Sequence, residues 1–114
     1  MHKKKHSSEE ILIAVEQLLN KFKLEDITNI SLIQKSLFFD QAYIATGRSS
    51  LQIKSIAKQI CDLLKIKYHI PTIMEGYIRG EWIIIDCSSV QVNLFLKDTR
   101  LKYNLEEFWG CKKQ

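Results

Sequence analysis

The sequence has few prolines and glycines, no long apolar run and no recognisable secretion signal. It contains one proline and four glycines in 114 residues, too few for a collagen-like or low-complexity disordered chain. No apolar run approaches the ~20 residues that a membrane-spanning helix needs. The first residues are basic and are followed by polar Ser7–Glu10 rather than by the apolar segment of a secretion signal. We therefore expect a cytoplasmic protein with no membrane association.

Cysteine and histidine are scarce, with three of each, and their spacing argues against the common metal sites. No two cysteines form a Cys-x-x-Cys motif, and the histidines are not spaced as zinc ligands. Cys61 falls in a helical pattern and Cys87 at the end of a strand pattern, so we interpret both as small core residues. His69 lies beside Ile70-Pro71 without a nearby nucleophile, which favours a surface histidine. We expect no metal and no cofactor.

The net charge of +4 belongs to the chain ends. Of 17 Lys and Arg residues, five are Lys3, Lys4, Lys5, Lys112 and Lys113, which leaves 12 in residues 7–110 against all 13 acidic residues. We predict a basic disordered tail at 1–6, one domain at 7–110 and a short tail at 111–114. Nucleic-acid-binding domains usually carry basic charge on the folded body. We favour solubilising tails, and the alternative is weak, salt-sensitive contact with RNA.

Periodicity and turn residues predict the order α-β-β-α-β-β-β-α. Helical spacing of apolar residues indicates a helix after a Ser7–Glu10 capping box and a second one after Ser49-Ser50. Strands are predicted at 26–33, 38–46, 72–78, 82–87 and 90–96, the helices at about 7–23 and 50–68, and one or two short helices at 97–110. The first two strands should be antiparallel because their connection is short. The expected fold class is α/β, a single domain with a mixed five-stranded sheet and flanking helices.

The last predicted hairpin has two different faces. A two-residue Ser88-Ser89 loop fixes the register and makes one face wholly apolar, which is the expected core face. The other face carries two aromatic residues, one isoleucine, two amides and one carboxylate: Trp82, Phe95, Ile84, Gln91, Asn93 and Asp86. Aromatic residues beside a few polar groups are typical of protein-binding surfaces. The alternative is that a terminal helix of the same chain covers this face.

The sequence offers little catalytic chemistry. The turn Gly47-Arg48-Ser49-Ser50 precedes a predicted helix, where backbone amides can bind an anion, although a helix cap explains both serines equally well. Nucleotidyltransferases follow such a turn with two closely spaced carboxylates that hold Mg²⁺ ions. Here the later strand carries Asp86 alone at its end, and Glu81 should point to the other face. A non-catalytic binding protein is favoured over an enzyme.

Four blocks in order resemble the Iojap family, the ribosomal silencing factors (RsfS). The blocks are Phe38–Gln52 (FFDQAYIATGRSSLQ), Glu75-Gly76, Trp82–Asp86 (WIIID) and Tyr103–Gly110 (YNLEEFWG). The resemblance covers nearly the whole chain beyond the first few residues. It implies a nucleotidyltransferase-like fold that lacks the catalytic carboxylate pair.

The resemblance also implies a function. Family members bind the large ribosomal subunit through its fourteenth ribosomal protein, block subunit joining sterically and so repress translation. Relatives in organelles assist assembly of the large subunit, and free family members form homodimers. A residual nucleotide-binding or nucleotidyltransferase activity is the less favoured alternative.

The hairpin supplies the residues that we expect to meet the partner. Glu75 and Asp86 can bind basic side chains, and Trp82 is the expected hot spot. The full predicted set is Glu75, Gly76, Trp82, Ile84, Asp86, Asn93 and Phe95. The chain departs from the family pattern at the turn Ser88-Ser89, where Gly-Asp is usual, and at Asn93, where His is usual.

Overall fold

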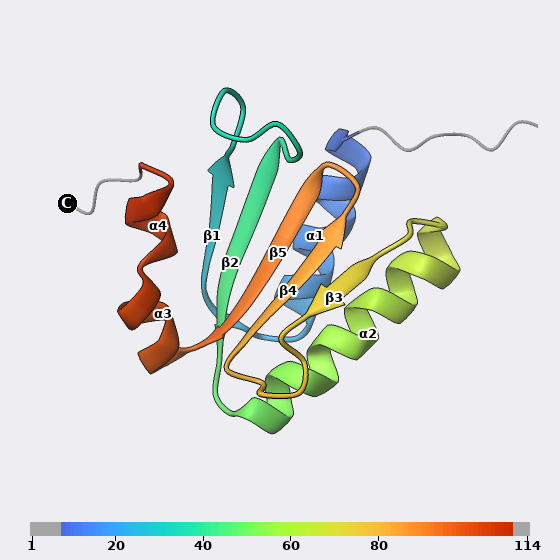
Figure 1. Ribbon diagram of the computed structural model, residues 1–114. Helices are drawn as coiled ribbons and strands as arrows, with labels where there is room; N and C mark the ends of the chain where they lie inside the picture. Colours follow the sequence, from blue (N-terminus) through green and yellow to red (C-terminus); the bar gives the residue numbers. More distant parts are fainter. Residues whose placement is uncertain (1–7, 111–114) are drawn as a thin grey trace, which may run out of the picture.

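The computed structural model describes residues 8–110 and contains four helices and five strands in that part of the chain. The predicted tails, the cap residue Ser7 and Cys111 lie outside the described residues. In chain order the elements are α1 (Ser8–Lys21), β1 (Glu25–Ser31), β2 (Gln41–Gly47), α2 (Ser50–Tyr68), β3 (Ile73–Glu75), β4 (Trp82–Cys87), β5 (Val90–Leu96), α3 (Lys97–Tyr103) and α4 (Leu105–Phe108) (Figure 1). The predicted α/β class and element order are confirmed.

One mixed sheet in the order β1-β2-β5-β4-β3 forms the centre of the molecule. β1 and β2 are antiparallel as predicted, and β2 runs parallel to β5. The β4–β5 hairpin has the predicted register, with Trp82 opposite Phe95, Ile84 opposite Asn93 and Asp86 opposite Gln91. The two-residue turn therefore fixes which side chains share a face.

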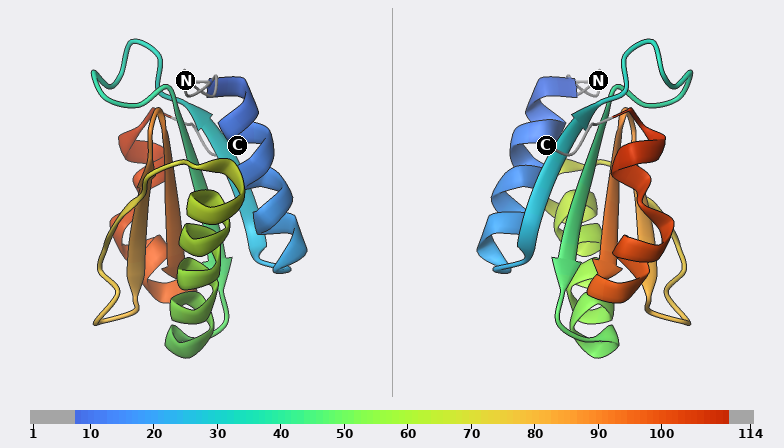
Figure 2. Two further views of the ribbon diagram at one scale, coloured as in Figure 1. Left: turned by 90° about the vertical axis from the view of Figure 1, so that its right-hand side faces the viewer. Right: turned by 90° about the vertical axis from the view of Figure 1, so that its left-hand side faces the viewer.

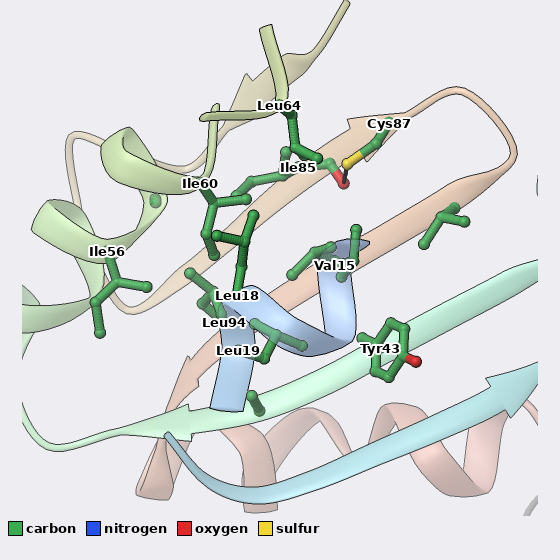
Figure 3. Close-up of a cluster of buried hydrophobic side chains, with 14 of the residues drawn as sticks. Val15, Leu18, Leu19, Tyr43, Ile56, Ile60, Leu64, Ile85, Cys87 and Leu94 are labelled. Carbon is green, nitrogen blue, oxygen red and sulfur yellow. Dashed lines mark hydrogen bonds between the residues drawn. The ribbon is translucent and has the colours of Figure 1, made fainter. Parts of the chain in front are cut away.

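Helices cover both faces of this sheet. α1 and α2 lie on one side, and α3 and α4 lie on the other (Figure 2). The larger core cluster joins α1, α2 and the apolar face of β4–β5, where Val15, Leu19, Ile60, Ile85 and Leu94 are fully buried (Figure 3). A three-layer architecture of this kind buries both faces of the central strands.

The two described cysteines belong to this core. Cys87 is fully buried and Cys61 is half-buried. Burial is the main cause that raises the pKa of each thiol above its ordinary value, since it disfavours the thiolate. Both side chains therefore act as small packing residues, as predicted.

Local turns shorten two of the predicted strands relative to the sequence pattern. β2 begins at Gln41 rather than at Phe38, because the Ser36 hydroxyl accepts the N–H groups of Phe38 and Phe39, each at 3.1 Å, and bends the chain. β3 ends at Glu75, because Gly76 has a φ of +82° and its carbonyl accepts the Gly80 N–H at 3.1 Å. Local turns override β-branched composition in both places.

Candidate protein-binding surface

The mixed face of the β4–β5 hairpin is divided by the helices that follow it. Phe95 and Asn93, on the inner strand β5, have no exposed surface. Leu105 and Trp109 from the α4 region pack on the core cluster that contains Phe95 and Ile44 of β2. The prediction that Phe95 and Asn93 contact a partner directly is wrong while α4 is in place. The C-terminal helices cover this half of the face, which was the alternative reading of the sequence.

Asn93 instead organises the covered half. Its Oδ1 accepts the indole N–H of Trp82 at 3.0 Å, and its amide group donates to the Tyr43 carbonyl at 3.3 Å and to Gln91 Oε1 at 3.1 Å. A buried amide is stable only when its polar atoms are paired in this way. Asn93 therefore fixes the orientation of the Trp82 ring.

Trp82 lies at the border between the covered and the open half. Its ring stacks on Phe95 with centroids 4.8 Å apart and tilts against Tyr103 with centroids 5.1 Å apart. Trp82 is half-buried, and Tyr103 is 54% exposed. Both rings are thus held rigidly, with part of their surface in solvent.

The open half of the face lies on β3 and β4. Glu75 is opposite Ile84, and Ile73 is opposite Asp86, so these four side chains share one side of the sheet. Glu75 and Ile73 are exposed, with Ile73 at 65%, and Ile84 and Asp86 are half-buried. Together with Trp82 these residues form what we call the open half-face. It offers apolar area, one aromatic edge and two carboxylates, a combination that suits a basic protein partner.

Gly76 has a backbone role next to this surface. A Cβ atom built on it would lie 2.1 Å from the Trp82 carbonyl oxygen, and its φ of +82° favours glycine. Only glycine allows β3 to turn so close to the start of β4. The sequence singled out Gly76 as a contact residue, and the structure gives it this positioning function.

Arg100 holds the C-terminal helices on the sheet. Its side chain is 11% exposed and forms an ion pair with Glu106 at 2.8 Å. The same guanidinium donates to the Asp26 carbonyl at 2.7 Å and to the hydroxyls of Thr46 and Thr28 at 2.8 and 3.0 Å. Sequence reasoning missed this residue, because all partners but Glu106 lie far away along the chain.

The turn Gly47–Ser50 is occupied by structural contacts. Ser49 caps α2, since its hydroxyl accepts the Gln52 N–H at 3.0 Å, and the Ser50 hydroxyl donates to the Arg79 carbonyl at 3.3 Å. Arg48 pairs with Glu25 at 3.4 Å, with both side chains largely exposed. These bonds explain the turn as a helix cap, and anion binding there stays a prediction.

A crevice of about 720 Å³ lies beside this turn, at the carboxyl ends of β2 and β5. Its lining includes Arg48, Arg79 and Lys97 but also the carboxylates Glu81 and Asp98. The mixed charge gives no preference for a polyanion. Between residues 8 and 110, moreover, no group of three His, Cys, Asp or Glu side chains is placed to hold a metal ion.

Comparison with known proteins agrees with this architecture. Residues 5–114 match the family described as "Ribosomal silencing factor during starvation". The chain belongs to the ribosomal silencing factor family. The resemblance found in the four sequence blocks is thereby confirmed.

Several curated proteins are similar to most of this chain. The Ribosomal silencing factor RsfS of Zymomonas mobilis is 32% identical over 102 residues, which are 90% of this chain and 77% of the relative. That of Bacillus subtilis is 35% identical over 88 residues, 77% of this chain and 75% of the relative. A more distant mouse protein, named "Mitochondrial assembly of ribosomal large subunit protein 1", is 23% identical over 104 residues, 86% of this chain and 46% of its own length.

Solved structures show the same fold. A crystal structure of a Chromobacterium violaceum protein superimposes with a TM-score of 0.88 at 28% identity, covering 96% of this chain and 91% of the other. One from Bacillus halodurans gives a TM-score of 0.80 at 30% identity, covering 90% and 95%. No helix among residues 8–110 has the length and apolar character needed to cross a membrane.

Proposed function

We propose that this chain binds the large ribosomal subunit through its fourteenth ribosomal protein and sterically blocks joining of the small subunit. The observation that carries the proposal is the open half-face, where Glu75 and Asp86 flank the exposed Ile73 and the half-buried Ile84. Membership of the ribosomal silencing factor family supports the same partner class.

Charge supports a basic partner. Residues 7–110 have a small net negative charge, and the excess positive charge lies in the chain ends. Ribosomal proteins are typically basic, so two carboxylates on a rigid sheet favour their approach and register. Trp82 adds the rigid aromatic anchor that hot spots commonly have.

Co-sedimentation tests the proposal directly. The purified protein is mixed with isolated large subunits, isolated small subunits or whole ribosomes and spun through a sucrose cushion. We expect it to pellet with large subunits alone, because the small subunit hides the site in whole ribosomes. Equal recovery with both isolated subunits would instead indicate general RNA binding and would contradict the proposal.

Reversing the charge of Asp86 should disrupt this contact. Asp86→Lys places a cation against a basic partner, and we expect the Kd for large subunits to rise at least 30-fold, about 2 kcal/mol. Glu9→Lys is the matched control, since Glu9 is exposed on α1, away from the open half-face. Fluorescence anisotropy of a labelled protein gives both constants. Equal constants for the two variants would place the binding surface elsewhere.

Assistance in assembly of the large subunit is a second candidate function. The observation that favours it is the name of the mouse relative, which describes a protein of ribosomal large-subunit assembly. Cells that lack this chain should then accumulate incompletely assembled large subunits during exponential growth. Silencing alone predicts mature large subunits and an excess of joined ribosomes under starvation, so sedimentation profiles of the two cultures separate the functions.

We further propose that the protein is not an enzyme. Isothermal titration calorimetry with ATP or CTP and Mg²⁺ should give no binding tighter than about 100 μM, because the turn at 47–50 is used as a helix cap and the neighbouring crevice carries acids. Tighter binding that Ser49→Ala and Ser50→Ala abolish would establish a nucleotide site instead.

The remaining parts of the proposal concern the cellular location, the oligomeric state and the role of the tails. We propose that the protein acts in the cytoplasm, that it forms a homodimer when free and that its tails add weak contact with ribosomal RNA. Sedimentation velocity of the free protein at micromolar concentration tests the dimer. A single monomeric species over the whole concentration range would contradict it.

A further inference from the structure

One flank of α2 carries a line of lysines. Within Ser50–Tyr68 the helix has four lysines and one acidic residue, Asp62. Lys54, Lys58 and Lys65 recur at intervals of four and seven residues, which places them on one stripe of the helix. We call these three residues the basic ridge.

Contacts show which way the ridge faces. Cys61 lies on the same stripe, between Lys58 and Lys65, and packs half-buried against the larger core cluster. Lys54 and Lys58 lie against Tyr77, which follows β3. The ridge therefore runs beside the edge strand of the sheet.

Tyr77 holds two of these cations close together. The ammonium groups of Lys54 and Lys58 lie 5.7 and 5.2 Å from the centroid of the same ring. The ring attracts each cation, but two lysines four residues apart on a helix repel each other. An anion bound between them would relieve this repulsion, and it would meet cations whose positions are already restricted.

The β3–β4 loop brings a further cation to the same end of α2. Ser50 donates to the Arg79 carbonyl at 3.3 Å, and a Cβ atom built on Gly80 would lie 2.6 Å from Lys54 Cε. The loop is thus packed closely on the first turns of the helix. The Arg79 side chain is 81% exposed and forms an ion pair with the half-exposed Glu81, which solvent weakens.

The ridge and the open half-face lie on opposite sides of β3. α2 packs on one face of the sheet (Figure 2). Glu75 and Asp86 share the other face with Trp82. One side of this edge is therefore basic and the other acidic. A partner that presents basic protein next to nucleic acid would match both sides at once.

We propose that the basic ridge binds the phosphate backbone of ribosomal RNA beside the ribosomal protein contact. This inference rests on the proposed function and adds a second partner to it. Lysine is depleted in the cores of protein–protein interfaces, whereas spaced lysines along a helix fit a phosphate backbone. The folded body, and not only the tails, then contributes to RNA binding.

The test compares two double variants of the full chain. Lys54→Gln with Lys58→Gln removes two ridge charges, and Lys21→Gln with Lys67→Gln removes two exposed lysines elsewhere on α1 and α2. Affinity for isolated large subunits is measured at several salt concentrations. We expect the ridge variant to bind roughly tenfold more weakly near 100 mM salt, with a log–log salt slope smaller by between one and two. The control should keep the affinity and slope of the unmodified protein.

A second arm uses the isolated fourteenth ribosomal protein without RNA. The ridge variant should bind it as tightly as the unmodified protein does. Equal weakening in this arm would mean that the ridge touches protein and would overturn the inference. Unchanged binding of the ridge variant to whole large subunits would overturn it too, while leaving the proposed function intact. Failure of the unmodified protein to bind large subunits at all would instead reject the proposed function itself.

Discussion

Arg100→Ala is expected to lower the free energy of unfolding by about 3–5 kcal/mol. The substitution leaves Glu106, whose side chain is 17% exposed, without its cation. It also removes the donors that bind the Asp26 carbonyl and the hydroxyls of Thr28 and Thr46. In a buried site, a polar group left without a hydrogen-bond partner destabilises the fold by more than the lost hydrogen bond had stabilised it.

The matched control is Arg79→Ala. Arg79 also pairs with a glutamate, at 3.3 Å, but its side chain is 81% exposed, and exposed pairs contribute at most about 1 kcal/mol. Urea denaturation of the two variants measures both effects. If Arg100→Ala unfolded at the same urea concentration as Arg79→Ala, Arg100 would not anchor α3 and α4 on the sheet.

Trp82→Ala should reduce both stability and binding. The ring stacks on Phe95 and donates to the buried Asn93, so we expect a stability loss of about 3–5 kcal/mol, as for other large aromatic truncations. The exposed part of the ring belongs to the open half-face, so the folded fraction should also bind large subunits more weakly by roughly 2 kcal/mol.

Ile85→Ala gives the comparison that separates the two effects. Ile85 is fully buried in the larger cluster, on the opposite face of β4, and its truncation should cost about 2–5 kcal/mol in stability. Its folded fraction should bind with unchanged affinity. Denaturant titration and binding below the melting temperature measure both quantities. Unimpaired binding by folded Trp82→Ala would show that Trp82 is only a core residue.

The sequence predicted the hairpin well because its register depends on local features. A two-residue loop at Ser88-Ser89 and strict alternation determine which side chains of β4 and β5 share a face. The apolar face is buried as predicted, and the acidic end of the other face is open. These properties can be predicted from the hairpin sequence alone, without knowledge of the rest of the chain.

The sequence alone could not determine whether Phe95 and Asn93 are buried or exposed. Their burial depends on how the short helices after Leu96 fold back, and that is set by Arg100 bonds to residues at least 50 positions away. The apolar pair Leu105 and Trp109, one helical turn apart, was the available signal, because such a pair needs a surface to cover. This pair indicated that the C-terminal helices could cover the hairpin face, but it did not exclude that a partner protein covers it instead.

A subunit-joining assay tests the central claim most directly. Large subunits are incubated with saturating protein, small subunits are added with Mg²⁺, and the products are separated on a sucrose gradient. We expect the whole-ribosome peak to fall in proportion to occupied large subunits, and Asp86→Lys to restore it. A whole-ribosome peak that stays unchanged while the protein remains bound to large subunits would contradict the steric block.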